Sequence, residues 1–374
     1  MHVKSIIIGS LSIPLIRPFI TAVRRTDSVE DIVVQIITNT GHIGYGNAAI
    51  TPLITGDSRE SIICTIKDII APLLIGQKIT PDSGPSSNFN HLFELINTSI
   101  PKNTSAKAAL DIALHDLFAQ ARNLPLYQLL GGTQNEIRTG ITISAKSTDE
   151  MVNDAKALVA QGFTTIKIKV GLYAATDIER IKALCNAIGD SAKIMIDANQ
   201  GWGVNSAIKI MRELEALNLN LEFIEQPVIA SDLNGLKLVH DSVNSCIMAD
   251  EACFSPQDAS TLAKNRACDG VNIKLMKSGG IYNANAIYNI AKNANLKVMV
   301  GCMLESPIGI AAISSFAIAH PDILFADLDA IALIKDNPVI GGARLNGNTI
   351  SLSNFPGLGI TGFSDGFNIL YEIN

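Results

Sequence analysis

Six ionisable residues recur after residue 160 of the sequence, each near the carboxyl end of a short apolar segment. They are three acids and three lysines: Asp197, Glu225, Asp250, Lys167, Lys169 and Lys274. Carboxylate oxygens, with no histidine at these positions, suit a hard divalent cation such as Mg²⁺. A buried lysine serves as an acid or a base when its pKa approaches neutrality. These residue types predict metal-assisted proton transfer and disfavour zinc chemistry or a histidine base.

Two of the lysines lie in the apolar segment FTTIKIKV, which alternates like a β-strand. Side chains two residues apart in a strand point to the same side, so Lys167 and Lys169 share one face while isoleucines and a valine take the other. An adjacent ammonium group, a divalent cation and burial all lower the pKa of a lysine. We therefore expect Lys169 to transfer a proton, with Lys167 lowering its pKa and facing a developing oxyanion.

The elements that must position these residues form a repeat that begins after residue 137. Short apolar segments alternate with helix-length connections such as TDIERIKALCNAIG. Eight strands, seven of them followed by such a connection, are typical of the α/β class and favour a (β/α)₇β modified TIM barrel. The eight predicted strands are RTGITIS, TTIKIKV, AKIMIDA, LEFIEQP, SCIMADE, GVNIKLM, KVMVGCM and ILFADLD.

Polar residues fall at the carboxyl ends of these strands, one repeat apart. Intervals of 24 to 28 residues separate Thr142, Lys169, Asp197, Glu225, Asp250, Lys274, Cys302 and Asp327. In a barrel, these strand ends converge on the face that carries the active site. Lys169 and Lys274 belong to the second and sixth strands, so they should face each other across the barrel mouth. Two proton-transfer groups on opposite sides of one carbon are what inversion of configuration requires.

The first part of the chain has a different pattern. The segments SIIIGSLSIPLI, DIVVQIITN and HIGYGNA predict an antiparallel meander. Two helical patterns follow, the second with Ser105 as its predicted N-cap. We therefore predict an α+β domain over residues 1–130 and a barrel domain over residues 131–344. The tail, residues 345–374, is expected to pack back on the first domain.

Composition narrows the classes of function. The chain has 374 residues, 47% of them apolar and 17% charged, and a net charge of −6, so it can bury a large core and lacks the basic patch that nucleic-acid binding needs. Six cysteines without a CxxC pair fit reduced thiols in the cytoplasm. The apolar stretch 298–319 contains Glu305 and Pro307 and is not a membrane span. We expect a cytoplasmic homo-oligomer that binds neither nucleic acid nor membrane.

The ordered motifs KIKVG, DANQGW, EQP, ADE, NIKLMKSGG and GCMLES resemble the enolase superfamily and, within it, the muconate-lactonising-enzyme subgroup. AALDIALHDL and PLYQLLGG resemble the capping region of that subgroup, so the resemblance covers nearly the whole chain. It implies a capping domain on a (β/α)₇β barrel and one Mg²⁺ per subunit on the three carboxylates. It also implies that Lys169 and Lys274 are the acid/base pair and that Lys167 assists at the oxyanion.

Within this subgroup, FADLDA resembles the dipeptide epimerases, in which two aspartates hold the α-ammonium group of a dipeptide. Here they would be Asp327 and Asp329, because a pair of anions suits an ammonium group. RPFITAVR resembles the specificity loop of L-Ala-D/L-Glu epimerases, which implies that Arg24 pairs with a glutamate side chain. Thr142 and the segment 302–304, which is Cys302, Met303 and Leu304, would complete the substrate site.

The implied reaction is a 1,1-proton transfer that epimerises the C-terminal residue of L-Ala-L/D-Glu, a fragment type of bacterial peptidoglycan. Other reactions of the scaffold stay open: cycloisomerase, o-succinylbenzoate synthase and N-acylamino acid racemase. A catalytically silent barrel that only binds a ligand is a further alternative, although it has no reason to retain buried like charges. Strand alternation places Glu251 behind the ligands, and Asn199 could face the site without an evident role.

Overall fold

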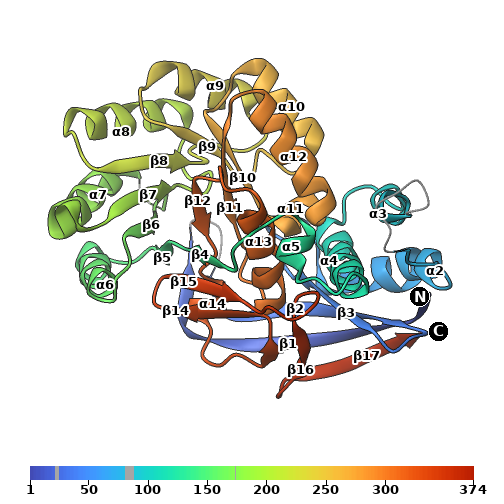
Figure 1. The fold of residues 1–374 in the computed structure, drawn as a ribbon. Helices are drawn as coiled ribbons and strands as arrows, with labels where there is room; N and C mark the ends of the chain where they lie inside the picture. The colour runs from blue at the N-terminus through green and yellow to red at the C-terminus, as the bar shows by residue number, and fades with distance from the viewer. Residues whose placement is uncertain (22–24, 81–87, 173) are drawn as a thin grey trace.

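A four-stranded antiparallel sheet and an eight-stranded parallel sheet organise the protein (Figure 1). The computed structural model describes residues 1–21, 25–80, 88–172 and 174–374. The antiparallel sheet contains the first three strands of the chain and its last strand. The parallel sheet contains the eight strands that the repeat predicts, and it carries the candidate site.

The parallel sheet confirms the predicted barrel, with its strands in sequential order from β5 to β12. Its two end strands lie close to each other: the N–H of Gly140, just before β5, donates to the carbonyl oxygen of Ala326 in β12 at 2.8 Å. The strands are β5 (Ile141–Ile143), β6 (Thr165–Lys169), β7 (Lys193–Asp197), β8 (Leu221–Glu225), β9 (Ile247–Ala249), β10 (Gly270–Ile273), β11 (Lys297–Gly301) and β12 (Phe325–Asp327).

Helices connect these strands and pack outside the barrel; α8, for example, buries one apolar stripe, whereas α13 is buried on nearly all sides. Capping boxes set some of their starts; Ser147 and Glu150, for example, exchange side-chain-to-backbone hydrogen bonds at the start of α6. Within the described ranges, no helix has the length and apolar character that crossing a membrane requires. The helical elements are α6 (Thr148–Ala160), α7 (Ala174–Ile188), η2 (Gly189–Ser191), α8 (Val204–Ala216), α9 (Leu233–Ser242), α10 (Pro256–Asn265), α11 (Leu275–Ser278), α12 (Ile281–Asn293), α13 (Pro307–Ala319) and α14 (Ala330–Leu333).

The barrel interior is apolar toward one end and charged toward the other. Four buried side chains form a separate apolar cluster: Met195, Phe223, Met248 and Met299. Two residues further along their strands, Met195 is followed by Asp197 and Phe223 by Glu225, so the same strand face turns polar at its carboxyl end. Lys167 and Lys169 occupy this interior face of β6, which explains why an apolar strand carries two lysines on one side.

The N-terminal sheet has the order β17-β1-β2-β3, which confirms the predicted meander and adds the last strand of the chain. Its strands are β1 (Val3–Ile20), β2 (Arg25–Thr38), β3 (Ile43–Ala49) and β17 (Phe367–Ile373). The helical elements that follow it are α1 (Arg59–Cys64), the π-helical η1 (Thr65–Ile70), α2 (Ala71–Leu74), α3 (Phe89–Thr98), α4 (Thr104–Ala121) and α5 (Leu126–Leu129).

Helix α4 joins the two parts of the molecule and is buried on nearly all sides. Its Asp111 carboxylate accepts the Ile281 N–H at 2.6 Å, at the start of barrel helix α12. Glycine is required where β3 crosses the helix, because a Cβ at Gly46 would lie 1.8 Å from the Ala109 carbonyl oxygen. The helix therefore ties the N-terminal sheet to the βα unit that carries Lys274.

The predicted N-cap of this helix is wrong. Helix α4 begins at Thr104, after Asn103 in the left-handed conformation, so Ser105 lies inside the first turn. The Ser105 N–H donates to Asp57 at 2.9 Å, so a distant carboxylate satisfies a free N–H group of the first turn.

Short strands after the barrel return the chain to its beginning, where β17 pairs antiparallel with β1. The predicted domain boundaries, after residues 130 and 344, stay predictions. The remaining strands are β4 (Glu136–Arg138), β13 (Val339–Gly341), β14 (Ala343–Asn346), β15 (Thr349–Leu352) and β16 (Ile360–Phe363).

Candidate active site

A cavity opens at the carboxyl ends of the barrel strands, next to the end of β1 and the loop after β3. Its lining is Phe19, Thr21, Ile54, Thr142, Lys167, Lys169, Asn199, Asp250, Glu251, Lys274, Cys302, Met303, Leu304, Asp327 and Asp329. Every residue predicted to contact substrate is on this wall except Arg24, which lies outside the described residues. A larger hollow at the amino end of β8 contains none of the predicted residues.

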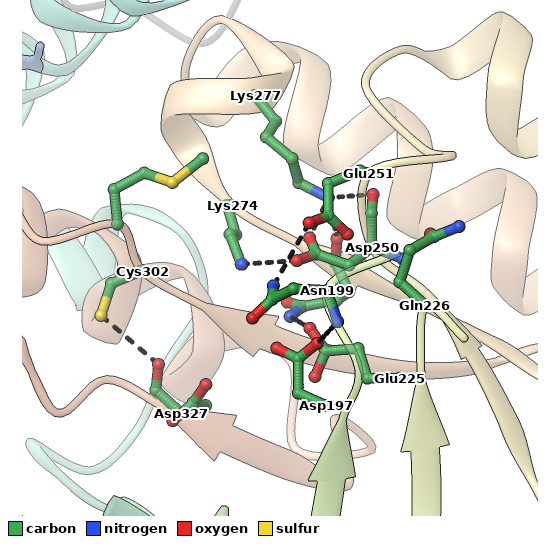
Figure 2. Close-up of polar contacts among 12 residues, drawn as sticks. Asp197, Asn199, Glu225, Gln226, Asp250, Glu251, Lys274, Lys277, Cys302 and Asp327 are labelled. Atoms are coloured by element: carbon green, nitrogen blue, oxygen red, sulfur yellow. Dashed lines mark hydrogen bonds and ion pairs between the residues drawn. The ribbon is translucent and has the colours of Figure 1, made fainter. Parts of the chain in front are cut away.

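Three carboxylates meet at the floor of the cavity, at the ends of adjacent strands (Figure 2). Asp197 ends β7, Glu225 ends β8 and Asp250 follows β9, and each is at most 1% exposed. One carboxylate oxygen from each residue lies within 4.8 Å of the other two. Consecutive parallel strands thus bring together acids that are about 25 residues apart in sequence, which is the geometry of a cation site.

The wider group of charges at the cavity, which we call the cavity cluster, contains more acids than bases among the described residues. Its members are Asp197, Glu225, Asp250, Glu251, Asp327 and Asp329, with Lys167, Lys169, Lys274 and Lys277. Burial, together with repulsion from Asp197 and Asp250, raises the pKa of Glu225 to about 7. With every acid ionised, the cluster has two excess negative charges, which one divalent cation would balance, so the oxygen-only donor set fits Mg²⁺.

Lys167 is fully buried and surrounded by carboxylates. Its Nζ lies 3.0 Å from Asp197 Oδ2, 2.8 Å from Glu225 Oε2 and 2.8 Å from Asp327 Oδ2. Burial disfavours the ammonium form, but these carboxylates outweigh burial and hold the pKa of Lys167 well above its ordinary value. Lys167 is therefore a fixed positive charge inside the barrel.

Lys169 and Lys274 approach the cluster from strands four positions apart in the barrel order. Lys169 Nζ lies 2.6 Å from Asp197 Oδ2, and Lys274 Nζ lies 2.7 Å from Asp250 Oδ2. The surroundings of Lys274 favour its charged form. Burial disfavours its charge, but the attraction of Asp250 and other acids is larger and raises the pKa.

Lys277 was missed by the sequence reasoning. It is 1% exposed, its Nζ lies 2.6 Å from Asp250 Oδ1, and it donates to the Asn272 carbonyl oxygen at 2.9 Å. Figure 2 shows Lys274 and Lys277 reaching Asp250 together. Its spacing of three residues from Lys274 was the available signal, because such spacing brings side chains together at the start of a helix.

Glu251 was expected behind the ligands, but it lines the cavity, where it accepts a hydrogen bond from Asn199 Nδ2 at 3.3 Å. The alternation of side chains fails here because β9 ends at Ala249 and Glu251 already belongs to a turn. Asn199 also donates its backbone N–H to Asp197 Oδ1 at 2.8 Å. Both residues therefore belong to the site.

Strained backbone follows two of the three carboxylates. Asn199 and Gln200 after Asp197, and Gln226 after Glu225, have φ values of 42°, 68° and 36°. Residues other than glycine rarely adopt such values, and they persist only where surrounding contacts hold them. The Gln226 side-chain oxygen accepts the N–H groups of Asp250 and Ala252 at 2.9 and 3.0 Å, which orients the third carboxylate.

Asp327 and Asp329 both reach the cavity, but not as neighbours on one strand face. β12 ends at Asp327, and Asp329 lies in helical conformation just before α14. Asp327 pairs with Lys167, whereas the Asp329 carboxylate accepts the Thr142 N–H at 2.7 Å and has no ion-pair partner among the described residues. Burial and the neighbouring Asp327 raise the pKa of Asp329 to about 6.

Family models match most of the chain. Residues 6–131 match the N-terminal domain of mandelate racemase and muconate lactonizing enzyme, and residues 150–364 match the enolase C-terminal domain-like family. The chain is 46% identical to the L-Ala-D/L-Glu epimerase of Clostridium acetobutylicum, with 98% of this chain and 100% of that protein covered.

Two solved structures are similar throughout. One is a substrate-liganded complex of the L-Ala-D/L-Glu epimerase of Bacillus subtilis, with a TM-score of 0.93, 40% identity, and 97% of this chain and 99% of that chain covered. The other is a dipeptide epimerase of Enterococcus faecalis V583 complexed with Mg and L-Leu-L-Tyr, with a TM-score of 0.91, 38% identity, and 96% and 100% covered.

Proposed function

Because this chain belongs to the enolase superfamily, we propose that it is a magnesium-dependent dipeptide epimerase, an isomerase that inverts the α-carbon of the C-terminal residue by 1,1-proton transfer. One observation carries the proposal: Lys169 and Lys274, four strands apart, line one cavity and flank a cluster of three carboxylates. A general acid and a general base on opposite sides of a carbon are sufficient for inversion.

Asp197, Glu225 and Asp250 are the residues that would hold one Mg²⁺. A bound Mg²⁺ supplies Lewis-acid stabilisation of the negative charge that develops when an α-proton is removed. The chain contributes the preorganisation: all three carboxylates are buried, and Gln226 orients the loop that carries Asp250. Lys167 adds a fixed positive charge, because its three carboxylate partners keep the side chain protonated.

The two remaining lysines move the proton. One Nζ, in its neutral form, takes the proton from one face of the α-carbon, and the other Nζ, as an ammonium group, returns a proton to the opposite face. By resemblance, Lys169 serves the L-epimer. Each lysine contacts a proposed metal ligand. A cation held by Asp197 and Asp250 would therefore weaken the attraction between these carboxylates and the lysine ammonium groups.

A dipeptide fits the acids at the other side of the cavity. Asp329 has no basic partner among the described residues and would accept the substrate α-ammonium group, together with Asp327. An N-acylated substrate brings no positive charge to these carboxylates, which disfavours the N-acylamino acid racemase and related alternatives. A silent binding barrel would leave the pairing of two lysines with the carboxylate floor without a purpose.

The preferred substrate is L-Ala-L/D-Glu, supported by the 46% identical relative of that name. Arg24 would bind the glutamate side chain. Apolar wall comes from Phe19, Ile54, Met303 and Leu304, and Thr142 and Cys302 complete the site. Such dipeptides arise in peptidoglycan degradation. We further propose action in the cytoplasm, supported by six free cysteines, as a homo-oligomer that engages neither nucleic acid nor a membrane.

The proposal is tested by incubating the purified protein with Mg²⁺ and a panel of free dipeptides in D₂O. Mass spectrometry should detect one deuterium per epimerised molecule, and chiral chromatography should detect both epimers. L-Ala-L-Glu should react, and its N-acetylated form should react at least tenfold more slowly, because the charged partner of Asp329 is removed. If no free dipeptide exchanges or epimerises, the assignment is refuted; equal rates with N-acetylated substrates would favour the acyl amino acid alternative.

A further inference from the structure

Two buried carboxyl groups meet where the N-terminal sheet contacts the barrel, and the proposed proton transfer uses neither. Asp31 lies on β2 and is 1% exposed; Glu305 lies between β11 and α13 and is 2% exposed. Asn47 of β3 and Ser306 are completely buried beside them. We call Asp31, Asn47, Glu305 and Ser306 the boundary cluster.

Hydrogen bonds connect this cluster across the boundary. Asn47 Nδ2 lies 2.8 Å from Asp31 Oδ2 and 3.4 Å from Glu305 Oε2, so one amide group reaches both acids. The Ser306 N–H donates to Asp31 Oδ2 at 2.8 Å. Sheet residues and barrel-loop residues 258 to 275 positions apart in sequence are thereby joined.

The boundary cluster contains no positively charged side chain. Among the described residues, no lysine, arginine or histidine lies within ion-pair distance of Asp31 or Glu305. Three polar atoms of the cluster are buried without a hydrogen-bond partner: Asp31 Oδ1, Asn47 Oδ1 and the Ser306 hydroxyl oxygen. Two adjacent anions without a counter-ion are costly in an apolar interior, whereas one added proton removes a charge and supplies a missing donor.

Burial, followed by the nearby Asp31, raises the pKa of Glu305 to about 8, and burial raises the pKa of Asp31 to about 6. The other titratable groups that face Glu305 are Lys274, whose charge acts in the opposite direction, and Cys302. Glu305 is therefore the member of the pair that keeps its proton at neutral pH.

Glu305 also shapes the wall of the cavity. Its Oε1 accepts the Met303 N–H at 3.0 Å, which closes the turn formed by residues 302–304. Cys302, Met303 and Leu304 all line the cavity. The conformation of this wall is thus linked through one side chain to Asn47 and Asp31 of the N-terminal sheet.

We propose that Glu305 is a positioning residue for the epimerisation proposed above: as a neutral acid, it holds residues 302–304 against Asn47 and Asp31 of the N-terminal sheet. The inference rests on the proposed function for its kinetic consequences but not for its structural ones. A neutral side chain is favoured because Asp31 Oδ1 and Asn47 Oδ1 lack a hydrogen-bond donor and the cluster contains no positive charge. The anion would keep its two hydrogen-bond donors, the Asn47 amide and the Met303 N–H, but have no positively charged partner, and repulsion from Asp31 would disturb the wall.

Two substitutions of Glu305 separate neutral hydrogen bonding from simple packing. Glu305→Gln keeps the oxygen that accepts the Met303 N–H, adds a donor and cannot ionise, so KM for Ala-Glu should stay within threefold of wild type. Glu305→Met keeps the length but loses the acceptor, so KM should rise at least tenfold while kcat changes less than threefold. Mg²⁺ affinity, measured by calorimetry with the metal alone, should change less than twofold in both.

A third substitution disturbs Glu305 from outside the cavity. A Cβ at Gly309 of α13 would lie 1.9 Å from Glu305 Oε2, so Gly309→Ala should reproduce the rise in KM although alanine favours a helix. Gly203→Ala is the matched control, because a Cβ there meets no atom within 4 Å and φ is −75°. It should change neither KM nor kcat.

Amide hydrogen exchange of the peptide containing residues 302–306 provides a readout that needs no activity. Protection of the Met303 amide should match wild type in Glu305→Gln and fall at least tenfold in Glu305→Met and Gly309→Ala. In wild type, KM should rise as the pH passes about 8, where Glu305 ionises, and Glu305→Gln should remove that rise.

Several outcomes overturn the proposal. If Glu305→Gln is as impaired as Glu305→Met, or if Met303 protection is unchanged in all variants, Glu305 does not position the wall as a neutral acid. If Glu305→Met does not fold, normal exchange and normal KM in Gly309→Ala would overturn the proposal equally. If the wild type turns over no dipeptide but the variants show the expected hydrogen exchange of the Met303 amide, the proposed function is refuted and the positioning role stands.

Discussion

The carboxyl groups of the cavity cluster and those of the boundary cluster are similarly buried but differ in their partners. At the cavity, Asp197 contacts two lysines, and these hold its pKa near 2 despite complete burial. At the boundary, Glu305 contacts an amide side chain and a backbone N–H group, and its pKa rises to about 8. Burial alone favours the neutral acid, so the low pKa of Asp197 depends on the lysines beside it.

The difference separates two uses of buried acids. The cavity cluster retains more carboxylates than lysines, which suits a divalent cation and a charged substrate. Glu305 of the boundary cluster needs no charge, because neutral hydrogen bonds are enough to hold a turn. Five experiments test this contrast.

Removing the cation should have the largest effect. Excess EDTA should abolish epimerisation, and added Mg²⁺ should restore it, because the three carboxylates would no longer hold the cation that stabilises the developing negative charge. Glu225→Gln should lower kcat/KM by at least a hundredfold. Thermal unfolding with and without Mg²⁺ supplies a measurement independent of turnover. Full turnover in excess chelator would show that the cavity cluster is balanced without a metal.

Replacing either proton-transfer lysine should come next. Lys169→Ala and Lys274→Ala should each lower the epimerisation rate by about 10³-fold or more. Each variant should still exchange the α-proton of one epimer with D₂O, because the other lysine remains. Chiral analysis of exchange from each pure epimer is the measurement. Retention of full epimerisation by both variants would disprove the two-base mechanism.

Lys167→Met should make the cavity cluster resemble the boundary cluster. Asp197, Glu225 and Asp327 would lose a common cation, and removing one partner of a buried ion pair costs about 3–5 kcal/mol of stability. Chemical denaturation in the absence of metal should detect this loss, and activity should fall about a hundredfold. Unchanged stability would mean that the acids of the cluster tolerate burial without Lys167.

Arg24 should supply the positive charge that pairs with the glutamate side chain of the substrate, a charge that the described apolar wall does not provide. A hydrogen bond to a charged group contributes roughly 1.5–3 kcal/mol, so Arg24→Leu should lower kcat/KM for Ala-Glu by about 10- to 100-fold. Ala-Leu should be affected much less, because it carries no side-chain carboxylate. Arg25, which is exposed and paired with Asp27 at 3.4 Å, is the matched control. An equal loss on both substrates, or a selective loss in Arg25→Leu, would remove Arg24 from this role.

The smallest effect should come from Asp31→Asn. The folded protein holds the proton of Asp31 up to about pH 6, whereas an unfolded chain releases it near 3.8. Wild-type stability should therefore fall as the pH rises from about 4 to 6, and Asp31→Asn should lack this loss of about 2–3 kcal/mol. Denaturation curves of both proteins across this range measure it. Parallel pH profiles would indicate that Asp31 is ionised in the folded state.

Much of the fold could be predicted from the sequence, because its signals are local. Alternation with period two marked the strands, and helix-length connections between them specified a parallel barrel. The same alternation placed Asp197, Glu225, Lys167 and Lys169 on the interior face of their strands. Local rules failed where an element ended: Ser105 lies inside α4, and Glu251 follows the end of β9 and turns into the cavity.

The amino-acid sequence alone indicates which residues lie at the carboxyl ends of the barrel strands, because strand period and repeat length set these positions. The partners of these residues depend on how the elements pack in space. The contact between Asn47 and Glu305 spans 258 residues and has no local signal, and the ion pair between Lys277 and Asp250 depends on how a short helix meets the neighbouring strand. Whether a buried acid is ionised or neutral follows from such distant neighbours, because the charge it carries depends on the groups that surround it in space.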